Sequence, residues 1–374
     1  MFITGKPVTG KNFIGRQKHL PLFKTYIDHN QSFMIKAPRR FGKTSLVKHM
    51  LKNKKEYVFV YVDIKRANSL EALANTIINK AYKIFSIDDF LYKAKNSMFD
   101  LLKSIQELEL DDIAERTVRM LENKNLDEVA YFLHSLDVMN YIAKKKDVNI
   151  KFALDEFQDI LNVSPDGILD KSSSVMKQHE NITYIFLGSM ETIMTRIFEH
   201  KSSPFFPFVT IVSLPPLDIV ELYEYSILQF QEKGIKCESL LHLLEYLQGH
   251  PDYSLQVLQQ LYFKAISNDI KELTNKDVYD TLIDVILNNK AYLDEVLSKA
   301  KLKKHSLNVL YSIANKEKFN LDSKTLYNVR SSLEDRGLIK KIGQGQYIIN
   351  NIFLDIYFQQ KEEKISLPGY SLEL

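Results

Sequence analysis

The sequence predicts an α/β fold in which a parallel sheet is followed by helical regions. Helix-like stretches separate five strand-like apolar runs, which lie at residues 33–37, 57–64, 149–156, 182–189 and 208–214. Near-continuous apolar runs of this kind are typical of strands buried on both faces of a parallel sheet. Because strands alternate with helices up to about residue 215, we predict one α/β domain over residues 1–215. A long helical insertion occupies about 69–145 of that domain.

The composition is that of an ordinary globular protein. The 374 residues suffice for two or three domains, and 45% of them are hydrophobic and 26% charged. The net charge of +3 does not by itself indicate a nucleic-acid binder, and the one cysteine, Cys237, excludes an internal disulfide. No apolar run reaches the ~20 residues that span a bilayer, and the first residues lack a signal-peptide pattern. We therefore predict a cytoplasmic protein that has no membrane partner.

A candidate phosphate-binding loop follows the first strand. The segment APRRFGKTS (37–45) matches the pattern G-x-x-x-x-G-K-[ST] except that Ala37 replaces the first glycine. A strand before it and a helix after it give the required context, in which backbone N–H groups and the helix N-terminus bind phosphates. Arg39 and Arg40 would face the nucleotide, a neighbouring subunit or solvent. The sequence thus predicts ATP-binding residues at Pro38, Arg39, Arg40, Phe41, Gly42, Lys43, Thr44 and Ser45.

Three residues of this loop have specific expected roles. Lys43 would bridge the β- and γ-phosphates and take part in catalysis, and the Thr44 hydroxyl would be a ligand of Mg²⁺. Gly42 would allow the backbone to approach the phosphates closely. Ala37 is compatible with such a loop provided that its φ angle is negative.

An acidic pair ends the third strand. In KFALDEFQD (151–159), Asp155 is expected to hold Mg²⁺, and Glu156 to orient and deprotonate the attacking water. Neighbouring side chains on a strand point to opposite faces, so both carboxylates can serve one site only if the chain bends there. Gln158 and Asp159 would either face this site or begin the next helix.

The fourth strand ends in Gly188-Ser189. A hydroxyl at this position could hydrogen-bond the γ-phosphate or the catalytic water, so Ser189 is a candidate catalytic residue. The alternative is that Ser189 caps the following helix.

With these elements in this order, the chain resembles the AAA-related P-loop ATPases of the ASCE division. It is most similar to the archaeal and bacterial STAND-type ATPases of the MNS clade, whose layout is like that of origin-recognition initiator ATPases. The segment FIGR (13–16) resembles the box that packs against adenine and ribose in that family. The resemblance implies that the base is framed by Phe13, Ile14 and Gly15, and that Arg16 lies near the nucleotide.

A second family-like motif lies in the helical region. GHP (249–251) resembles the glycine-His/Pro motif, which implies that His250 and Pro251 lie near the phosphates. The alternative is a helix stop formed by Gly249 and Pro251. Related ATPases often carry an arginine just before the last strand, and residues 204–209 have none, so Arg196 is the nearest basic candidate.

The C-terminal residues predict a winged helix-turn-helix over 299–374, after a helical lid over 216–298. Residues 299–341 contain eleven Lys or Arg and four acidic residues, in a pattern of two helices followed by a Gly-containing hairpin. A basic surface gives affinity for DNA phosphates. The candidate DNA contacts are Lys324, Asn328, Arg330, Lys340 and Lys341. The alternative is that the winged helix binds a protein or serves as a lid.

Together these features predict an ATP-binding and ATP-hydrolysing switch that uses ATP and Mg²⁺. Its cycle between ATP and ADP would move the lid and the winged helix, which act on DNA, on a protein partner or in self-assembly. Because no arginine finger is evident, hydrolysis would be slow or stimulated by a partner. One alternative is a DNA-binding regulator that holds nucleotide with little or no turnover. The other is a small-molecule phosphotransferase, for which no acceptor motif is visible.

Overall fold

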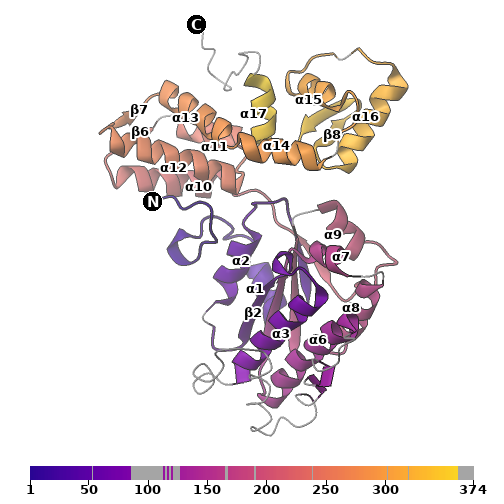
Figure 1. Ribbon diagram of the computed structural model, residues 1–374. Helices are drawn as coiled ribbons and strands as arrows, with labels where there is room; N and C mark the ends of the chain where they lie inside the picture. Colours follow the sequence, from indigo (N-terminus) through magenta and orange to yellow (C-terminus); the bar gives the residue numbers. More distant parts are fainter. Residues whose placement is uncertain are drawn as a thin grey trace. The chain divides into compact units, whose positions relative to one another are not determined.

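The computed structural model describes residues 1–52, 54–85, 113, 116–117, 119–120, 127–164, 167–188, 191–237, 239–300, 302–318 and 320–360. The chain divides into two compact units (Figure 1). The sheet unit consists of Gln17–Arg39 and Lys43–Leu214, and the helical unit of Met1–Arg16, Arg40–Gly42 and Pro215–Leu374. The α/β domain over residues 1–215 stays a prediction: the sheet unit ends at Leu214, and Met1–Arg16 and Arg40–Gly42 fall in the helical unit.

The sheet unit contains the predicted parallel sheet of five strands. Its spatial order is β2-β3-β4-β1-β5, and every neighbouring pair runs parallel. The five apolar runs of the sequence account for all five strands. Their bounds are β1 (Phe33–Lys36), β2 (Val58–Asp63), β3 (Ile150–Asp155), β4 (Ile182–Gly188) and β5 (Thr210–Ser213).

The strand register brings the polar ends of the strands to one edge. Lys36 at the end of β1 pairs with Gly188 of β4, and Asp155 of β3 pairs with Asp63 of β2. Because all strands are parallel, their carboxyl ends share that edge, which is where ligands collect in open α/β sheets.

Helices cover both faces of the sheet. They are α1 (Leu20–Asp28), α2 (Lys43–Leu51), α3 (Leu70–Phe85), α6 (Glu128–Lys145), α7 (Ile160–Val163), α8 (Ile168–Met176) and α9 (Glu191–Phe198). On one face α3 and α6 pack side by side over a core that includes Val60, Val62 and Phe152 (Figure 1). Side chains alternate along a strand, so Tyr61 and Asp155 lie on the other face, the side of α1 and α2.

The helical unit has its own core, and two small two-stranded sheets lie among its helices. Its elements are α10 (Ile219–Gln231), β6 (Lys236–Cys237), α11 (Leu240–Tyr246), α12 (Pro251–Ser267), β7 (Glu272–Leu273), α13 (Asn275–Asn288), α14 (Lys290–Lys299), α15 (Ser306–Ala314), α16 (Ser323–Asp335), β8 (Ile339–Gly343), β9 (Gln346–Ile349) and α17 (Ile352–Gln360). The β6–β7 pair, two residues per strand, was not predicted. The predicted order of two helices and a hairpin is present as α15, α16 and β8–β9.

The finer domain division stays a prediction. Residues 216–298 and 299–374 were assigned to separate lid and winged-helix domains, and both fall in the one helical unit. Of the insertion predicted over 69–145, α3 and α6 form its two ends, and most of residues 86–126 lies outside the described residues. In the part of the chain that the structure describes, no helix is long and apolar enough to cross a membrane.

Candidate functional site

The phosphate-loop lysine lies inside the turn of its own loop. Lys43 begins α2 and is 7% exposed, and its Nζ donates hydrogen bonds to the carbonyl oxygens of Ala37 (2.8 Å) and Pro38 (2.7 Å). A buried ammonium needs such acceptors because it has lost its water shell. The side chain is therefore already folded toward the loop that would surround the phosphates.

The backbone of the loop explains why one glycine is needed and another is not. Gly42 has a φ angle of +82°, a conformation that residues with a Cβ adopt only with strain. Ala37 is not among the positive-φ residues of the described chain, so alanine is accommodated there, as predicted. Arg40 also has a positive φ, +64°, so the loop holds one non-glycine residue in a left-handed conformation.

The phosphate loop and the acidic strand meet in a single hydrogen bond. The Thr44 hydroxyl, in the first turn of α2, donates to Asp155 Oδ2 at 2.7 Å. Asp155 ends β3 and is 6% exposed, and 111 residues separate it from Thr44 in the chain. The two residues expected to hold Mg²⁺ are thus adjacent in space.

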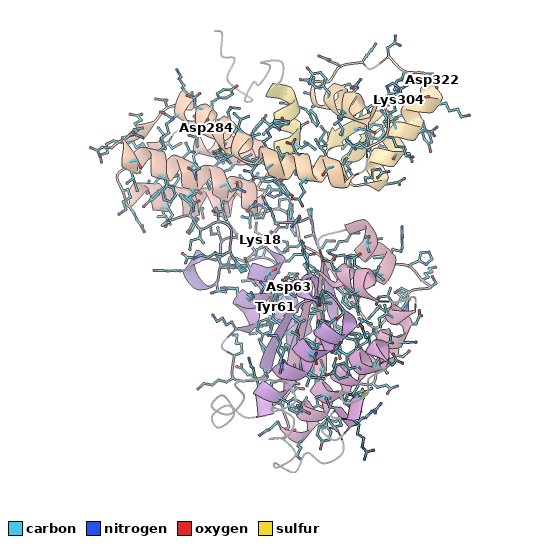
Figure 2. The ribbon with its side chains drawn as sticks, viewed as in Figure 1. Lys18, Tyr61, Asp63, Asp284, Lys304 and Asp322 are labelled. Atoms are coloured by element: carbon cyan, nitrogen blue, oxygen red, sulfur yellow. The ribbon has the colours of Figure 1, made fainter. Side chains whose placement is uncertain are left out.

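A third residue joins them that the sequence did not single out. Tyr61, on β2, donates its hydroxyl to the same Asp155 Oδ2 at 2.6 Å, and the backbone N–H of Glu156 donates to Oδ1 at 3.0 Å. Burial, followed by the negative charge of Asp155, raises the pKa of Tyr61 well above its ordinary value, so the phenol stays a donor. Figure 2 shows Tyr61 and Asp63 close together on β2.

The chain bends directly after Asp155. Glu156 has φ +52° and ψ +47°, the left-handed conformation, and it precedes a short 3₁₀ turn at Phe157–Asp159. This is the bend required for the two carboxylates to serve one site. Gln158, 4% exposed, donates from Nε2 to Glu156 Oε2 at 2.7 Å and so fixes the direction of that carboxylate.

Negative charge gathers at this edge of the sheet. Burial raises the pKa of Asp159, and the charges of Glu156 and Asp63 raise it further, while Lys65 and Arg39 act in the opposite direction. An edge of this kind favours a bound cation.

The oxygen donors at this edge fit Mg²⁺. Mg²⁺ prefers oxygen ligands and is usually held by one or two carboxylates together with waters and substrate phosphates. Among the described residues no group of three His, Cys, Asp or Glu could form a metal site of its own. The pair Thr44 and Asp155 therefore suits an ion that arrives with a phosphate.

The fourth strand brings Gly188 to the acidic edge of the sheet. Ser189 lies outside the described residues, so its predicted catalytic role stays a prediction. Gly188 ends β4, and a Cβ there would come within 2.5 Å of Gln158 Oε1 and 2.4 Å of Met194 Sδ. The strand end is therefore packed directly against the residue that orients Glu156.

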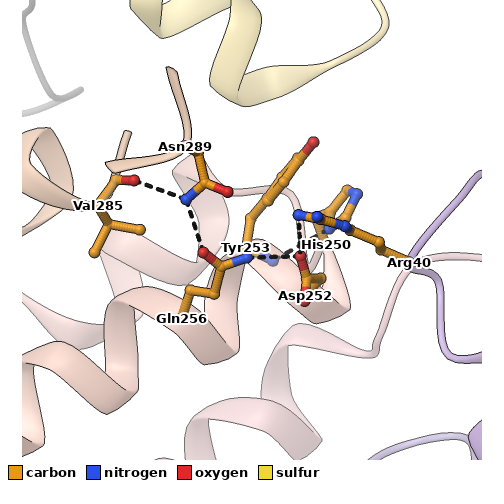
Figure 3. Close-up of polar contacts among 7 residues, drawn as sticks. All are labelled: Arg40, His250, Asp252, Tyr253, Gln256, Val285 and Asn289. Carbon is orange, nitrogen blue, oxygen red and sulfur yellow. Dashed lines mark hydrogen bonds and ion pairs between the residues drawn. The ribbon is translucent and has the colours of Figure 1, made fainter. Parts of the chain in front are cut away.

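The tip of the phosphate loop, Arg40–Gly42, makes its contacts within the helical unit. Arg40 donates to Asp252 Oδ2 at 3.1 Å (Figure 3). Its guanidinium lies 4.0 Å from the centroid of the Tyr292 ring. Asp252 also accepts from Gln256 at 2.6 Å, and Gln256 accepts from Asn289 at 2.8 Å. These hydrogen bonds connect the loop tip to the junction of α13 and α14.

The residues of the GHP motif lie beside this cluster and begin α12. His250 is the N-cap, with Nδ1 accepting from the Tyr253 N–H, and Pro251 occupies the first turn. The His250 ring stacks on Tyr253 at 3.8 Å and meets Phe41 edge-on at 4.8 Å. Burial lowers the pKa of His250 to about 3, so the ring is neutral. The helix boundary given as the alternative is present, and His250 and Phe41, both predicted ATP-binding residues, are in contact.

The FIGR segment lies in the same unit. Arg16, 4% exposed, donates to the carbonyl oxygens of Pro215, Pro216 (3.2 Å) and Phe41 (3.1 Å). Burial lowers the pKa of Arg16 to about 10, although Glu221 opposes the shift. Arg16 thus secures the backbone of the phosphate-loop tip. The base-framing roles of Phe13, Ile14 and Gly15 are not tested by these contacts.

The candidate DNA contacts lie on α16 and β8. Lys324, Asn328, Lys340 and Lys341 are exposed, whereas Arg330 is half-buried with its guanidinium 4.9 Å from the Tyr347 ring centroid. The helix α16 has a defined cap and stop. Asp322 caps the helix by accepting from the Thr325 N–H, and Gly337, with φ +69°, follows its end.

The sequence missed Tyr61, Asp252 and Tyr292, because none lies in a motif. A signal for Tyr61 existed in its period-2 spacing with Asp63 on a strand that neighbours β3. For Asp252 and Tyr292 no local signal marks contact with a loop more than 200 residues earlier.

Among solved structures, the chain is similar to a Walker-type ATPase of Pyrococcus abyssi. The TM-score is 0.66 at 14% identity, over 95% of this chain and 98% of that one. It is also similar to the ORC2 protein of Aeropyrum pernix, solved in complexes with ADPNP and ADP. That TM-score is 0.56 at 13% identity, over 95% and 98% of the two chains. No family model and no curated protein matches the sequence. The strand order and these likenesses show that the chain has the fold of a P-loop nucleoside triphosphatase of the AAA+ type.

Proposed function

We propose that this chain binds ATP and hydrolyses it to ADP and phosphate, and that the nucleotide state alters the helical unit. The observation that carries the proposal is the 2.7 Å hydrogen bond between Thr44 and Asp155. It joins the first turn after a phosphate loop to the carboxylate at the end of an inner strand, the pairing that nucleotide hydrolysis requires. The solved structures similar to this chain, an ATPase and a protein bound to ADPNP and ADP, support the same interpretation.

In this proposal the loop binds the phosphates and the acidic edge performs the hydrolysis. Lys43 exchanges its two carbonyl acceptors for phosphate oxygens, and Thr44 and Asp155 hold Mg²⁺. The ion, when bound, neutralises developing charge on the phosphates. Glu156 accepts a proton from the attacking water, whose oxygen bonds to the γ-phosphorus while the bond to the β–γ bridging oxygen breaks. Gln158 keeps the carboxylate of Glu156 in one orientation.

The coupling to the helical unit rests on Arg40. A residue of the phosphate loop is bonded to Asp252, and through Gln256 and Asn289 to the start of α14. A ligand shifts a conformational equilibrium only if its contacts differ between the two states. Phosphates that draw Arg40 away from Asp252 would provide that difference. Membership of the STAND-type MNS clade is part of this proposal, supported by the FIGR and GHP segments.

Two variants test the proposal. Lys43→Ala should weaken ATP binding by roughly tenfold to a hundredfold, because it removes one charge-assisted hydrogen bond to the phosphates. Glu156→Gln should bind ATP like the wild type and lose about 10²-fold or more in phosphate release. Binding is measured by equilibrium fluorescence with a labelled ATP, and hydrolysis by phosphate release under saturating ATP.

Matched controls exist for both changes. Lys52→Ala removes an exposed lysine just after the same helix, and Glu180→Gln removes an exposed carboxylate of the same unit. Both should behave like the wild type. Normal phosphate release by Glu156→Gln would disprove the assignment of the catalytic base, and normal ATP binding by Lys43→Ala would disprove the binding loop.

A second candidate function is a DNA-binding regulator that holds nucleotide without turnover. The exposed cations Lys324, Lys340 and Lys341 favour contact with nucleic-acid phosphates. This candidate predicts ATP binding by the wild type with no phosphate release in the presence or absence of duplex DNA. Stimulation of phosphate release by DNA, by a protein partner or at higher protein concentration would favour the switch.

A further inference from the structure

We infer that Tyr61 is a positioning residue for Asp155, fixing the carboxylate that holds the divalent metal ion of the nucleotide. The inference rests on the proposed function and adds one residue to its metal site. It is carried by the hydrogen bond of 2.6 Å from the Tyr61 hydroxyl to Asp155 Oδ2.

The hydrogen bonds of Asp155 show what the phenol contributes. Oδ2 accepts from both Tyr61 and Thr44, and Oδ1 accepts from the Glu156 backbone N–H. A carboxylate oxygen accepts about two hydrogen bonds, so Oδ2 is fully satisfied by these two hydroxyls. When Thr44 turns its hydroxyl oxygen to a metal ion, Tyr61 is the side-chain donor that still holds Oδ2.

The position of Tyr61 in the fold restrains its side chain. Tyr61 is on β2, paired with Ala153 of β3, so its side chain lies on the same face as Asp155, two residues further along the neighbouring strand. The Lys48 ammonium of α2 lies 4.3 Å from the centroid of its ring. The phenol is therefore held between the strand that carries Asp155 and the helix that carries Thr44.

The Tyr61 hydroxyl donates to the carboxylate that holds the metal ion. Donors of this kind around a metal-binding group orient the ligand, and their loss typically costs about 10–100-fold in metal affinity.

The test compares Tyr61→Phe with Tyr57→Phe. Tyr57 is also half-buried and lies just before β2, and its hydroxyl donates to the Met50 carbonyl at 3.4 Å, so the control removes the same atom from the same region. Mn²⁺ replaces Mg²⁺ as the probe, and electron paramagnetic resonance counts free Mn²⁺ in a titration of the protein saturated with ADP. ADP affinity is measured separately in EDTA.

Tyr61→Phe should weaken Mn²⁺ binding to the ADP complex about tenfold and leave the ADP affinity in EDTA unchanged. Tyr57→Phe should change neither quantity. If Tyr61→Phe binds Mn²⁺ as tightly as the wild type, the role of Tyr61 is overturned while the proposed function stands. A loss of ADP affinity in EDTA would also overturn this role, because it would show that Tyr61 supports the structure of the loop. A wild-type protein that binds no ADP would instead refute the proposed function, and the inference with it.

Discussion

Arg40 and Asp252 form an ion pair of 3.1 Å although 212 residues separate them in the chain. One belongs to the phosphate loop and the other to the first turn of α12. The exposed fractions of their side chains are 35% and 17%. Burial raises the pKa of Asp252 in spite of Arg40 and Gln256, which both lower it. The pair therefore joins the loop tip to α12 within the helical unit.

A double-mutant cycle measures this pair. Arg40→Ala, Asp252→Asn and the double variant should give a coupling free energy of about 1 kcal/mol, because the pair is only partly shielded from solvent. Urea unfolding gives the change in the free energy of unfolding for each of the three variants. A coupling energy near zero would mean that the ion pair does not hold the loop tip, and the proposed link to α12 would fail.

Lowering the pH should destabilise the protein partly through His250. Its pKa is 6.5 as an ordinary histidine and about 3 in the folded chain, because burial penalises the charged ring. Between these values the unfolded chain binds more protons, so stability is lost as the pH falls through 6.5 toward 3. At pH 5 the loss through this residue is about 2 kcal/mol.

His250→Asn keeps a side-chain acceptor at the N-cap and removes the titration. Its unfolding free energy should therefore fall by about 2 kcal/mol less than that of the wild type between pH 7 and pH 5. The pH dependence of the unfolding free energy is compared with that of His134→Asn, since burial also lowers the pKa of His134, to about 4. Equal pH dependence of the wild type and His250→Asn would contradict a neutral buried His250.

Gly249→Ala should be strongly destabilising. Gly249 has φ +63°, and a Cβ there would lie 2.4 Å from the Leu217 carbonyl oxygen, a backbone atom that cannot rotate away. Gly234→Ala is the matched control, because φ is +69° and nothing lies within 4 Å of the added Cβ. The control should cost about 1 kcal/mol from backbone strain, and Gly249→Ala at least about 2 kcal/mol more. Equal urea midpoints for Gly249→Ala and Gly234→Ala would show that the close approach of the Leu217 carbonyl to residue 249 does not matter for stability.

Removing lysines from β8 should weaken any binding to duplex DNA in a salt-dependent way. Lys340→Ala and Lys341→Ala each remove an exposed cation, so the slope of log K against log salt should fall by about 1 for each phosphate that is no longer neutralised. Lys233→Ala, which changes an exposed lysine after α10, should leave the slope unchanged. DNA affinity that does not vary with salt would exclude an interaction between these lysines and phosphates.

Much of the sheet unit was predictable because its signals are local. Each strand is an apolar run bounded by polar residues, and Gly42, Lys43 and Thr44 occupy consecutive positions whose chemistry is specific. The bend at Glu156 was also foreseeable, because two adjacent carboxylates on a strand cannot share a site without one. The helix cap at Asp322 and the stop at Gly337 follow from equally local rules.

The contacts that the sequence did not reveal join distant segments. Tyr61 looks like an ordinary strand residue until β2 is known to lie beside β3, and only then does its hydroxyl reach Asp155. Arg40 was expected to face a nucleotide, another subunit or solvent, and the hydrogen bond that it donates to Asp252 was not foreseen. No periodicity or spacing encodes such a partner, since tertiary packing alone decides which distant side chain a long flexible arginine meets.

The position of β4 limits how this protein can be recombined with similar ATPases. The strands that carry the phosphate loop and the acidic pair are not neighbours, since β4 lies between β1 and β3 and ends in Gly188. A Cβ at that end would meet the ends of the Gln158 and Met194 side chains, which would have to shift. A segment spanning residues 182–188 from another ATPase therefore either keeps a glycine at its last position or displaces Gln158, the residue that orients Glu156. Recombination at this strand thus acts on the acidic edge even though no residue of that edge is exchanged.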